Sequence, residues 1–539
     1  MLYKNRTIMK TKSIIVLYLI IFLTGVAMNT YSQGIDNSGG FVTASSTNYI
    51  KLSGSSDMTI SGTTADQTTL GNVAIDFTGT GTYKLTIPND SYVSIDGNLT
   101  LADSLLLEAN SSSSMASLIT NGTVKGAYGI VEQHIVQDQW HMVSSPVSAA
   151  QSIVYTDCYL YKWNEPDSTW AFITTLTEPL TVAKGFHLWS SSSAPTGPTD
   201  VEFTGLLNTG NYSPTITYNA GSNKGDGWNE LGNPYPSALE WNSSWTKSNV
   251  DATVYMYDGT QYKTWNYLLP MASTLPNGEI PSTQGFWVKA NAASPSITIP
   301  NAERVHSSNT FYKGGDELQD MFKINVSGNA YADEMIIGMF SDATDDFDSE
   351  YDAYKLMGIE AAPQLYSYGN GTKYAVNLFN EITEDKAVPL GFRAGADAEY
   401  TFEAEGLEDF DTSIDVYLED KSAGSMINLR ENPVYVFYAE NGLDEDRFVL
   451  HFGIDVAGTG QNVADNNINI YSFGDVVFVN YQLDVPGHVI VYDVLGKEIM
   501  SEALGTNQLN KLTVNNGRGY YIVKVISETN IETKKVLIN

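Results

Sequence analysis

The sequence predicts an all-β chain of several domains. Apolar residues alternate with polar ones over short runs, turn-forming Gly, Ser, Thr and Asn separate these runs, and long helical periodicity is scarce. At 539 residues the chain is too long for one hydrophobic core, so we expect three to five domains. In chain order we predict a signal peptide over 1–32, a β-solenoid-like segment rich in Ser, Thr and Gly over 33–136, a tandem β-repeat module rich in Trp over 137–315, an acidic antiparallel β-sandwich over 316–455, a linker over 456–466 and a C-terminal β-sandwich over 467–539.

The first 32 residues have the pattern of a secretory signal peptide. Lys10 and Lys12 precede the uncharged run Ser13–Met28, and we place the cleavage between Ser32 and Gln33. The apolar core of this run is shorter than the roughly 20 residues of a membrane-spanning helix. Nothing later in the sequence reaches that length, so we expect no transmembrane segment in the mature chain.

Short β-prone runs fill the segment over 33–136. Each run carries one or two apolar side chains, and turn sequences such as Asp96-Gly97-Asn98 and Asn121-Gly122-Thr123 break the pattern. Such strands bury too little surface for a sandwich, but they can stack as the coils of a solenoid. We therefore predict a small β-solenoid; the alternative is a loosely packed, low-complexity spacer.

A repeat of about 90 residues governs the middle of the chain. Trp140 precedes Pro146 by six residues, and Trp228 precedes Pro234 by the same distance. Three further matched segments follow in the same order. These segments pair Tyr159-Leu160-Tyr161 with Tyr255-Met256-Tyr257, Leu180 with Ile280, and Gly185-Phe186-His187-Leu188 with Gly285-Phe286-Trp287-Val288. We predict two copies of one β-unit packed in tandem. The run resembles an uncharacterised module of exported Bacteroidetes proteins, which implies a location but no chemistry.

All nine tryptophans lie between Trp140 and Trp287. Such density indicates a very aromatic core or a stacking surface. Trp140 and Trp228 occupy matched positions of the repeat, so we predict that both belong to the core. The others without a clear counterpart sit beside polar residues, which makes them candidates for stacking on sugar rings: Trp163, Trp170, Trp241, Trp245 and Trp265. Core packing is the favoured alternative.

The segment over 316–455 holds 31 acidic and 8 basic residues, half of the carboxylates of the chain. Six of them fall within eleven residues and are candidate calcium ligands: Asp342, Asp345, Asp346, Asp348, Glu350 and Asp352. Hard oxygen ligands suit Ca²⁺, although the spacing is not that of an EF-hand. The favoured alternative is a solvated acidic loop. No other cofactor is indicated.

Composition and motifs argue against several functions. A formal net charge of −33 repels nucleic acid and anionic lipid, so neither is an expected partner. The sequence contains no His-Glu-x-x-His, no Gly-x-Ser-x-Gly and no phosphate-binding glycine loop. Cys158 is the only cysteine, so the chain has no internal disulfide, and its apolar surroundings favour an inert thiol. We interpret the protein as non-catalytic.

The last seventy residues carry the most specific pattern. Ile468-Asn469-Ile470-Tyr471, Val491-Tyr492-Asp493-Val494-Leu495-Gly496-Lys497, Gly519-Tyr520-Tyr521-Ile522-Val523-Lys524-Val525 and Lys534-Lys535-Val536-Leu537-Ile538 follow one another with turn residues between them. This pattern resembles the type A C-terminal sorting domain of the Bacteroidetes type IX secretion system. Many members carry Tyr-Pro-Asn-Pro near the first strand, where this chain has Tyr471-Ser472-Phe473.

The resemblance implies an Ig-like sandwich that a type IX translocon recognises and a surface sortase removes. The cut would fall in the linker, with lipopolysaccharide as a candidate anchor for the new end. Carried onto this sequence, the sorting features are Gly496, Lys497, Gly519, Tyr521, Lys535 and Val536. We therefore expect a secreted or outer-membrane surface protein that passes through the periplasm and serves in adhesion or structure. The alternative is a carbohydrate-binding or carbohydrate-degrading accessory protein.

Overall fold

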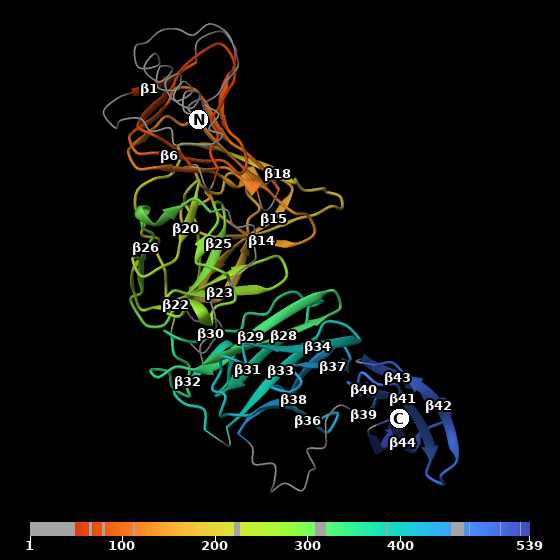
Figure 1. The fold of residues 1–539 in the computed structure, drawn as a ribbon. Helices are drawn as coiled ribbons and strands as arrows, with labels where there is room; N and C mark the ends of the chain where they lie inside the picture. Colours follow the sequence, from red (N-terminus) through yellow and green to blue (C-terminus); the bar gives the residue numbers. More distant parts are fainter. Residues whose placement is uncertain are drawn as a thin grey trace, which may run out of the picture. The chain divides into compact units, whose positions relative to one another are not determined.

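The computed structural model describes residues 49–63, 67–77, 81–111, 114–219, 227–307, 320–383, 386–453, 468–473, 475–506, 508–528 and 530–538. The predicted signal peptide and linker lie outside these residues. Strands make up nearly all of the regular structure, drawn in Figure 1, and the predicted all-β, multi-domain class is confirmed. The chain forms two compact units, Met1–Gly259 with Leu275–Gly314 and Thr260–Thr274 with Gly315–Asn539.

The first thirteen strands of unit 1 stack as parallel coils, as predicted, except for Ala109–Ser111 and Ser114–Met115, which pair antiparallel with each other. They are β1 (Tyr49–Leu52), β2 (Met58–Thr59), β3 (Thr68–Leu70), β4 (Asn72–Ile75), β5 (Lys84–Ile87), β6 (Tyr92–Ile95), β7 (Leu99–Leu101), β8 (Ser104–Leu107), β9 (Ala109–Ser111), β10 (Ser114–Met115), β11 (Ser117–Thr120), β12 (Val124–Lys125) and β13 (Gly129–His134). Three parallel sheets result, ordered β1-β4-β7-β12, β3-β6-β11 and β2-β5-β8-β13. Val73 pairs with Leu99 and Leu99 with Val124, so one coil takes 25 or 26 residues.

Aliphatic side chains and turn amides hold these coils together. Leu70, Val73 and Leu99 point inward and are less than 2 % exposed, so each short strand contributes to one continuous core. Asn98 accepts a hydrogen bond from the Thr123 amide and donates its own amide to the Asn72 side chain, both at 2.8 Å. Antiparallel β18 (Asp200–Gly205) covers the edge of β13, which blocks further strand addition there.

The two copies of the repeat have the same strand pattern. Copy 1 contains β14 (Trp140–Val143), η1 (Ser152–Tyr155), β15 (Cys158–Asn164), η2 (Glu165–Asp167), β16 (Thr169–Phe172) and β17 (Phe186–Ser190). Copy 2 contains β19 (Trp228–Gly232), β20 (Ala238–Glu240), β21 (Thr246–Ser248), β22 (Val250–Tyr257), β24 (Glu279–Ile280), β25 (Gly285–Ala290), β26 (Ser296–Thr298), η4 (Asn301–Glu303) and β27 (Arg304–Val305). In both copies the last of the three matched strands pairs antiparallel with the other two: β17 with β14 and β15, and β25 with β19 and β22.

Backbone hydrogen bonds join the copies in a nearly symmetrical way. The Ser144 amide donates to the Thr283 carbonyl at 2.8 Å, and the matched amide of Gly232 donates to the matched carbonyl of Ala183 at 3.1 Å. Both acceptor residues have positive φ, 61° for Thr283 and 65° for Ala183. Close approach requires glycine at Gly185, where an added Cβ would lie 2.4 Å from the Leu231 carbonyl oxygen.

The acidic segment builds one large sheet. Its strands are β28 (Met321–Gly328), β29 (Tyr331–Met339), β30 (Ala353–Tyr354), β31 (Gln364–Gly369), β32 (Thr372–Phe379), β33 (Ala387–Ala394), β34 (Ala398–Glu405), β35 (Val416–Asp420), β36 (Ser425–Asn428), β37 (Val434–Ala439) and β38 (Gly442–Phe452). Both ends of the strand order contribute to one apolar core, so the sheet curls over itself as a sandwich does. The antiparallel prediction was wrong for one pair, because β29 and β32 run parallel.

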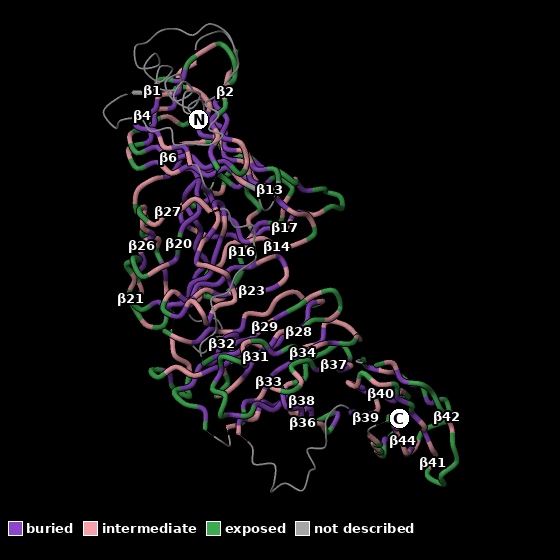
Figure 2. The backbone as a smooth tube through the Cα atoms, viewed as in Figure 1, coloured by how far each residue is buried: buried purple, intermediate pink, exposed green. Residues whose placement is uncertain are grey.

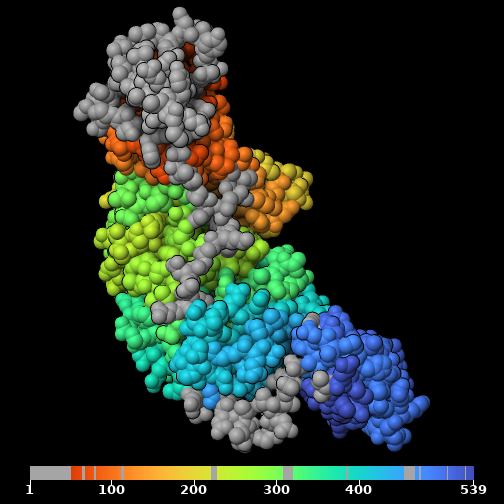
Figure 3. All heavy atoms as spheres, in the orientation of Figure 1, coloured from red at the N-terminus to blue at the C-terminus, as the bar shows by residue number. Residues whose placement is uncertain are grey.

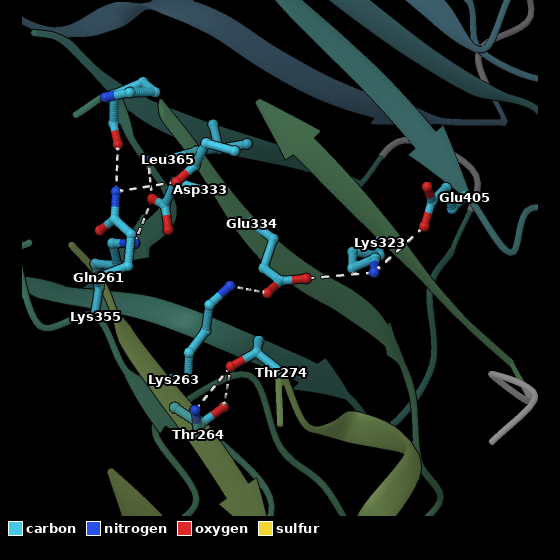
Figure 4. Close-up of polar contacts among 12 residues, drawn as sticks. Gln261, Lys263, Thr264, Thr274, Lys323, Asp333, Glu334, Lys355, Leu365 and Glu405 are labelled. Carbon is cyan, nitrogen blue, oxygen red and sulfur yellow. Dashed lines mark hydrogen bonds and ion pairs between the residues drawn. The ribbon is translucent and has the colours of Figure 1, made fainter. Parts of the chain in front are cut away.

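Residues 260–274 contribute β23 (Tyr262–Asn266) and η3 (Pro270–Ala272) to unit 2. Figure 4 shows how charged side chains fix this segment on the sheet: Glu334 joins Lys263 and Lys323, and Lys323 reaches Glu405 at 3.3 Å. A second ion pair, between Lys355 and Asp333, is almost completely buried; the Leu365 amide also donates to Asp333, at 2.7 Å. In a chain without disulfides, such pairs fix strand positions.

The close contact at Gly185 predicts a specific destabilisation. We expect Gly185→Ala to lower the free energy of unfolding of unit 1 by about 1–3 kcal/mol, because its Cβ would collide with backbone of the other copy. Urea denaturation of the full chain followed by tryptophan fluorescence measures the change. The control is Gly54→Ala, where an added Cβ has no neighbour within 4 Å. Equal stability of the two variants would contradict this packing.

A buried carboxyl in β22 predicts a pH dependence. Asp251 is 2 % exposed, accepts one hydrogen bond from Asn291 at 2.9 Å, and has no hydrogen-bond partner for Oδ2 among the described residues. Burial raises the pKa of this carboxyl to about 7, against the opposing effects of Asn291, Lys289 and Lys247. The folded state therefore keeps a proton that the unfolded state releases near pH 4, and stability falls as the pH rises between these values.

We expect Asp251→Asn to match the wild type near pH 4 and to exceed it increasingly up to pH 7, with no further gain above. The gain at pH 8 should be on the order of 2–4 kcal/mol, since one pKa unit corresponds to about 1.4 kcal/mol. Urea titrations at several pH values measure it. A constant difference across pH 4–8 would show that Asp251 is ionised throughout.

Candidate functional site

The C-terminal domain is a small two-sheet sandwich, as the sequence predicts. Its strands are β39 (Ile468–Phe473), β40 (Val476–Tyr481), β41 (Gly487–Asp493), β42 (Glu498–Leu504), β43 (Gln508–Thr513), β44 (Gly519–Ser527) and β45 (Ile531–Ile538). They form antiparallel sheets ordered β39-β40-β43 and β42-β41-β44-β45. Figure 3 shows this domain, in blue, as a compact body, and Figure 2 shows buried and less buried residues alternating along β41.

Four of the predicted sorting residues occupy turns and outer positions. Gly496 and Lys497 form the exposed hairpin turn between β41 and β42, and Gly496 has a φ of +82° that favours glycine. Asp493 fixes this turn, since its side chain accepts hydrogen bonds from the amides of Leu495 and Lys497, both at 2.9 Å. Gly519 begins β44 with a φ of +153°, and the exposed Lys535 ammonium lies 3.8 Å from the ring centroid of Tyr520.

The other two sorting residues belong to the core. Tyr521 and Val536 are directly paired between β44 and β45, and they are 4 % and 5 % exposed. The Tyr521 hydroxyl donates to the Gly517 carbonyl at 2.8 Å, which ties the turn before β44 to the core. The sorting residues therefore comprise two structural anchors and a set of exposed groups.

The sorting domain also contacts the acidic sheet, within unit 2. Phe478 stacks on Tyr438 of β37 with centroids 5.2 Å apart, and the Tyr471 hydroxyl accepts the Tyr438 amide at 3.2 Å. Lys511 pairs with Glu399 at 2.5 Å, although both side chains are about 40 % exposed. An exposed ion pair adds little stability. Aromatic and aliphatic packing around Tyr471 and Phe478 and a hydrogen bond from the Lys534 ammonium to the Ala423 carbonyl, at 2.6 Å, complete the contact.

An aromatic surface covers one face of copy 1. Residues directly paired between antiparallel strands share a face, and the pairs Trp140–Trp189, Tyr159–Trp189, Tyr161–Phe172 and Trp163–Trp170 are all aromatic. We call these seven residues, on β14, β15, β16 and β17, the aromatic face. The opposite face of the same sheet carries Leu160 and Leu188, which are buried in the hydrophobic core.

Part of the aromatic face is open to solvent. Tyr159, Trp170 and Phe172 are 46 %, 42 % and 48 % exposed, and the remaining four rings are half-buried. Phe172 lies 5.0 Å from Tyr161 and 6.1 Å from Tyr159, with interplanar angles of only 35° and 32°. These three rings form a gently curved strip across two strands.

Copy 2 supports the other end of this face. Trp287 of β25 is 6 % exposed and contacts Trp163 and Trp170 edge-on, at 5.7 and 5.8 Å. The His187 ring lies 4.3 Å from that of Trp170, and its Nδ1 lies 2.8 Å from Glu230 Oε1. The other oxygen of Glu230 is buried without a hydrogen-bond partner in the described part of the chain. The two copies thus fix the ring positions together.

The structure divides the five candidate stacking tryptophans. Trp163 and Trp170 lie on the aromatic face, but Trp241 and Trp245 are 0 % and 4 % exposed and donate their indole N–H groups to backbone carbonyls. Since a sugar must reach the ring face, the stacking prediction was wrong for these two residues. Trp265 is half-buried and belongs to the other unit.

Sequence reasoning missed most of the aromatic face. Trp140 was predicted to be core but is half-buried, and Tyr159, Tyr161, Phe172 and Trp189 were not candidates. The alternation Tyr-Leu-Tyr-Lys-Trp along β15 could have found them, because residues two apart on a strand share one face.

The six acidic residues proposed for calcium do not converge. Asp345 pairs with Lys386, Asp346 accepts a hydrogen bond from Asn370, and Asp348 accepts the Thr344 amide at 2.6 Å. Asp352 is 1 % exposed and accepts the Leu378 amide at 2.9 Å, while Asp342 and Glu350 are exposed. No three His, Cys, Asp or Glu side chains gather as a metal site among the described residues, so the calcium prediction finds no support.

Cys158 lacks the character of a nucleophile. Burial raises the pKa of its thiol to about 11, so it stays protonated at neutral pH. No described helix is long and apolar enough to cross a bilayer.

Two family models match this chain. A model described as a domain of unknown function (DUF8693) matches residues 38–267 and again residues 243–452. A model described as a secretion system C-terminal sorting domain matches residues 461–539, which confirms the resemblance read from the motifs of the tail.

No curated protein matches the chain. Among solved structures, a biofilm associated protein, BSP domain, is similar at 8 % sequence identity over 61 % of this chain and 81 % of that chain. The TM-score of 0.12 is too low to support an argument about fold or function.

Proposed function

Because the chain belongs to the family described as a domain of unknown function (DUF8693) and ends in a type IX sorting domain, we propose that it is a non-catalytic adhesion or structural protein of the cell surface or the secreted fraction. The observation that carries this proposal is the C-terminal sandwich itself. It has a separate apolar core, built by residues such as Val489, Val523 and Tyr521, so it can be recognised as a folded body.

The route of export follows from the sorting domain. This domain implies contact with the type IX secretion machinery and points to secretion or to the cell surface. We further propose that passage through the periplasm precedes removal of the domain by a surface sortase within 456–466, and that lipopolysaccharide is the anchor of the new end. The domain has its own apolar core, separate from that of the acidic sheet, which suits a domain that is removed after export.

The second candidate function is that of a carbohydrate-binding or carbohydrate-degrading accessory protein. The solvent-open rings of the aromatic face support the binding half of this proposal. Release of reducing sugar from polysaccharides would reveal a degrading activity, and binding without release would leave the protein non-catalytic.

The sorting role of Tyr521 can be tested in the native host. We expect Tyr521→Ala to remove about 3–5 kcal/mol of stability from the small sandwich and to leave the protein in the periplasm. The matched control is Tyr520→Ala, since the neighbouring ring is 50 % exposed and lies outside the core. Cell fractionation with an antibody against residues 137–315 measures the location of both variants.

Export of Tyr521→Ala at the level of Tyr520→Ala would contradict a folded sorting signal. Sequencing the C-terminus of the surface protein then tests the cleavage. An intact end at Asn539 would rule out removal of the domain.

A further inference from the structure

We propose that the aromatic face of copy 1 is a binding site for a neutral polysaccharide of equatorially substituted hexoses, such as a β-1,4-linked glucan. The inference rests on the proposed adhesion function and deepens it by naming a site and a ligand class. It starts from the observation that the rings occupy the outer side of a sheet whose inner side is already packed.

The exposure of these rings needs an explanation. Leaving aromatic surface in water is unfavourable, and a contiguous exposed apolar patch marks an interaction site. Tyr159, Trp170 and Phe172 come from two neighbouring strands and are each more than 40 % exposed. A sheet that needed only stability would have polar side chains at these outward positions.

The geometry of the rings suits a flat, extended ligand. A hexose with equatorial hydroxyls presents C–H groups on its two faces, and these faces pack on aromatic rings while the hydroxyls at the rim stay in water. The strip of Tyr159, Phe172 and Tyr161 offers three rings tilted by no more than 35° between neighbours. Four strands make the face roughly 14 Å wide, enough for several sugar units in a row.

The charge of the protein narrows the ligand class. The seven rings of the aromatic face are uncharged, His187 shares the face through its pairing with Tyr161 but is buried against Glu230, and the chain carries a formal net charge of −33. An anionic polysaccharide would be repelled by this charge and would find no cation on the face. A neutral glycan pays no such electrostatic penalty.

The face is also preorganised. Ring contacts of 4.3–5.8 Å join Trp163, Trp170, His187 and Trp287, and His187 is in turn held by Glu230. Fixed rings lose little conformational entropy on binding, which favours affinity.

The test uses the purified full-length protein and four insoluble or soluble probes. We expect retention on microcrystalline cellulose and binding of cellohexaose with quenching of tryptophan fluorescence, and no binding of heparin or dextran. Phe172→Ala and Tyr159→Ala should each weaken cellohexaose binding about ten-fold, the effect of one aromatic contact of about 1.4 kcal/mol. Phe172→Tyr should retain binding.

The matched control is Tyr128→Ala, which removes a ring that is 51 % exposed and lies outside the aromatic face. This variant should bind cellohexaose as the wild type does. Urea denaturation of each variant checks that it is folded. The proposal would be overturned if the protein bound neither cellulose nor cellohexaose. Equal affinity of Phe172→Ala and Tyr128→Ala for cellohexaose would also overturn it.

Failure of this site is distinguishable from failure of the proposed export. Protease treatment of intact host cells reports surface location without using the aromatic face. A protein that is shaved from the surface but binds no glucan would refute the ligand and leave the location standing. Cellohexaose binding by a protein found only in the periplasm would refute the surface location and leave the ligand standing.

Discussion

The backbone contact between the two repeat copies is the constraint on which unit 1 depends. Amides of Ser144 and Gly232 reach carbonyls of the opposite copy, and Gly185 allows this approach because it has no side chain. A buried backbone group that loses its hydrogen-bond partner costs free energy, so these bonds favour one arrangement of the copies. The copies are therefore held in one register, and every side chain near the junction is placed by it.

The junction explains why the copies differ in exposure although they share a strand pattern. In copy 2, the face that corresponds to the aromatic face contains Trp287, Tyr255 and Glu230, all less than 7 % exposed. In copy 1 the rings farther from the junction, such as Tyr159 and Phe172, stay in solvent. The two copies thus contain similar sheets, but the corresponding face of copy 2 is buried and contacts the aromatic face, whereas part of the aromatic face of copy 1 stays exposed.

Unit 2 contains two main parts, the acidic sheet and the sorting domain. The Lys263–Glu334 ion pair of Figure 4 joins residues 260–274 to the acidic sheet, and the buried Lys355–Asp333 pair joins two segments of the acidic region itself. The carboxylates that look like a calcium loop in the sequence instead accept amides and pair with single cations, so the loop is held by its own hydrogen bonds. The sorting domain is joined to the acidic sheet by a small apolar cluster around Tyr471 and Phe478, by the Lys511–Glu399 ion pair and by a hydrogen bond from Lys534 to the Ala423 carbonyl.

The sequence by itself determined the all-β class, the coiled first segment, the duplicated unit and the sorting tail, since strand alternation, turn residues and motif order are local. It named Gly496 and Tyr521 as sorting features, and the structure places Gly496 in a hairpin turn and Tyr521 in the core of the sandwich. Only the tertiary structure decided that Trp241 is buried while Phe172 is exposed, and that six carboxylates close in sequence do not gather as a metal site among the described residues. Which face of a strand meets solvent depends on what packs against it, and that partner lies far away in the chain.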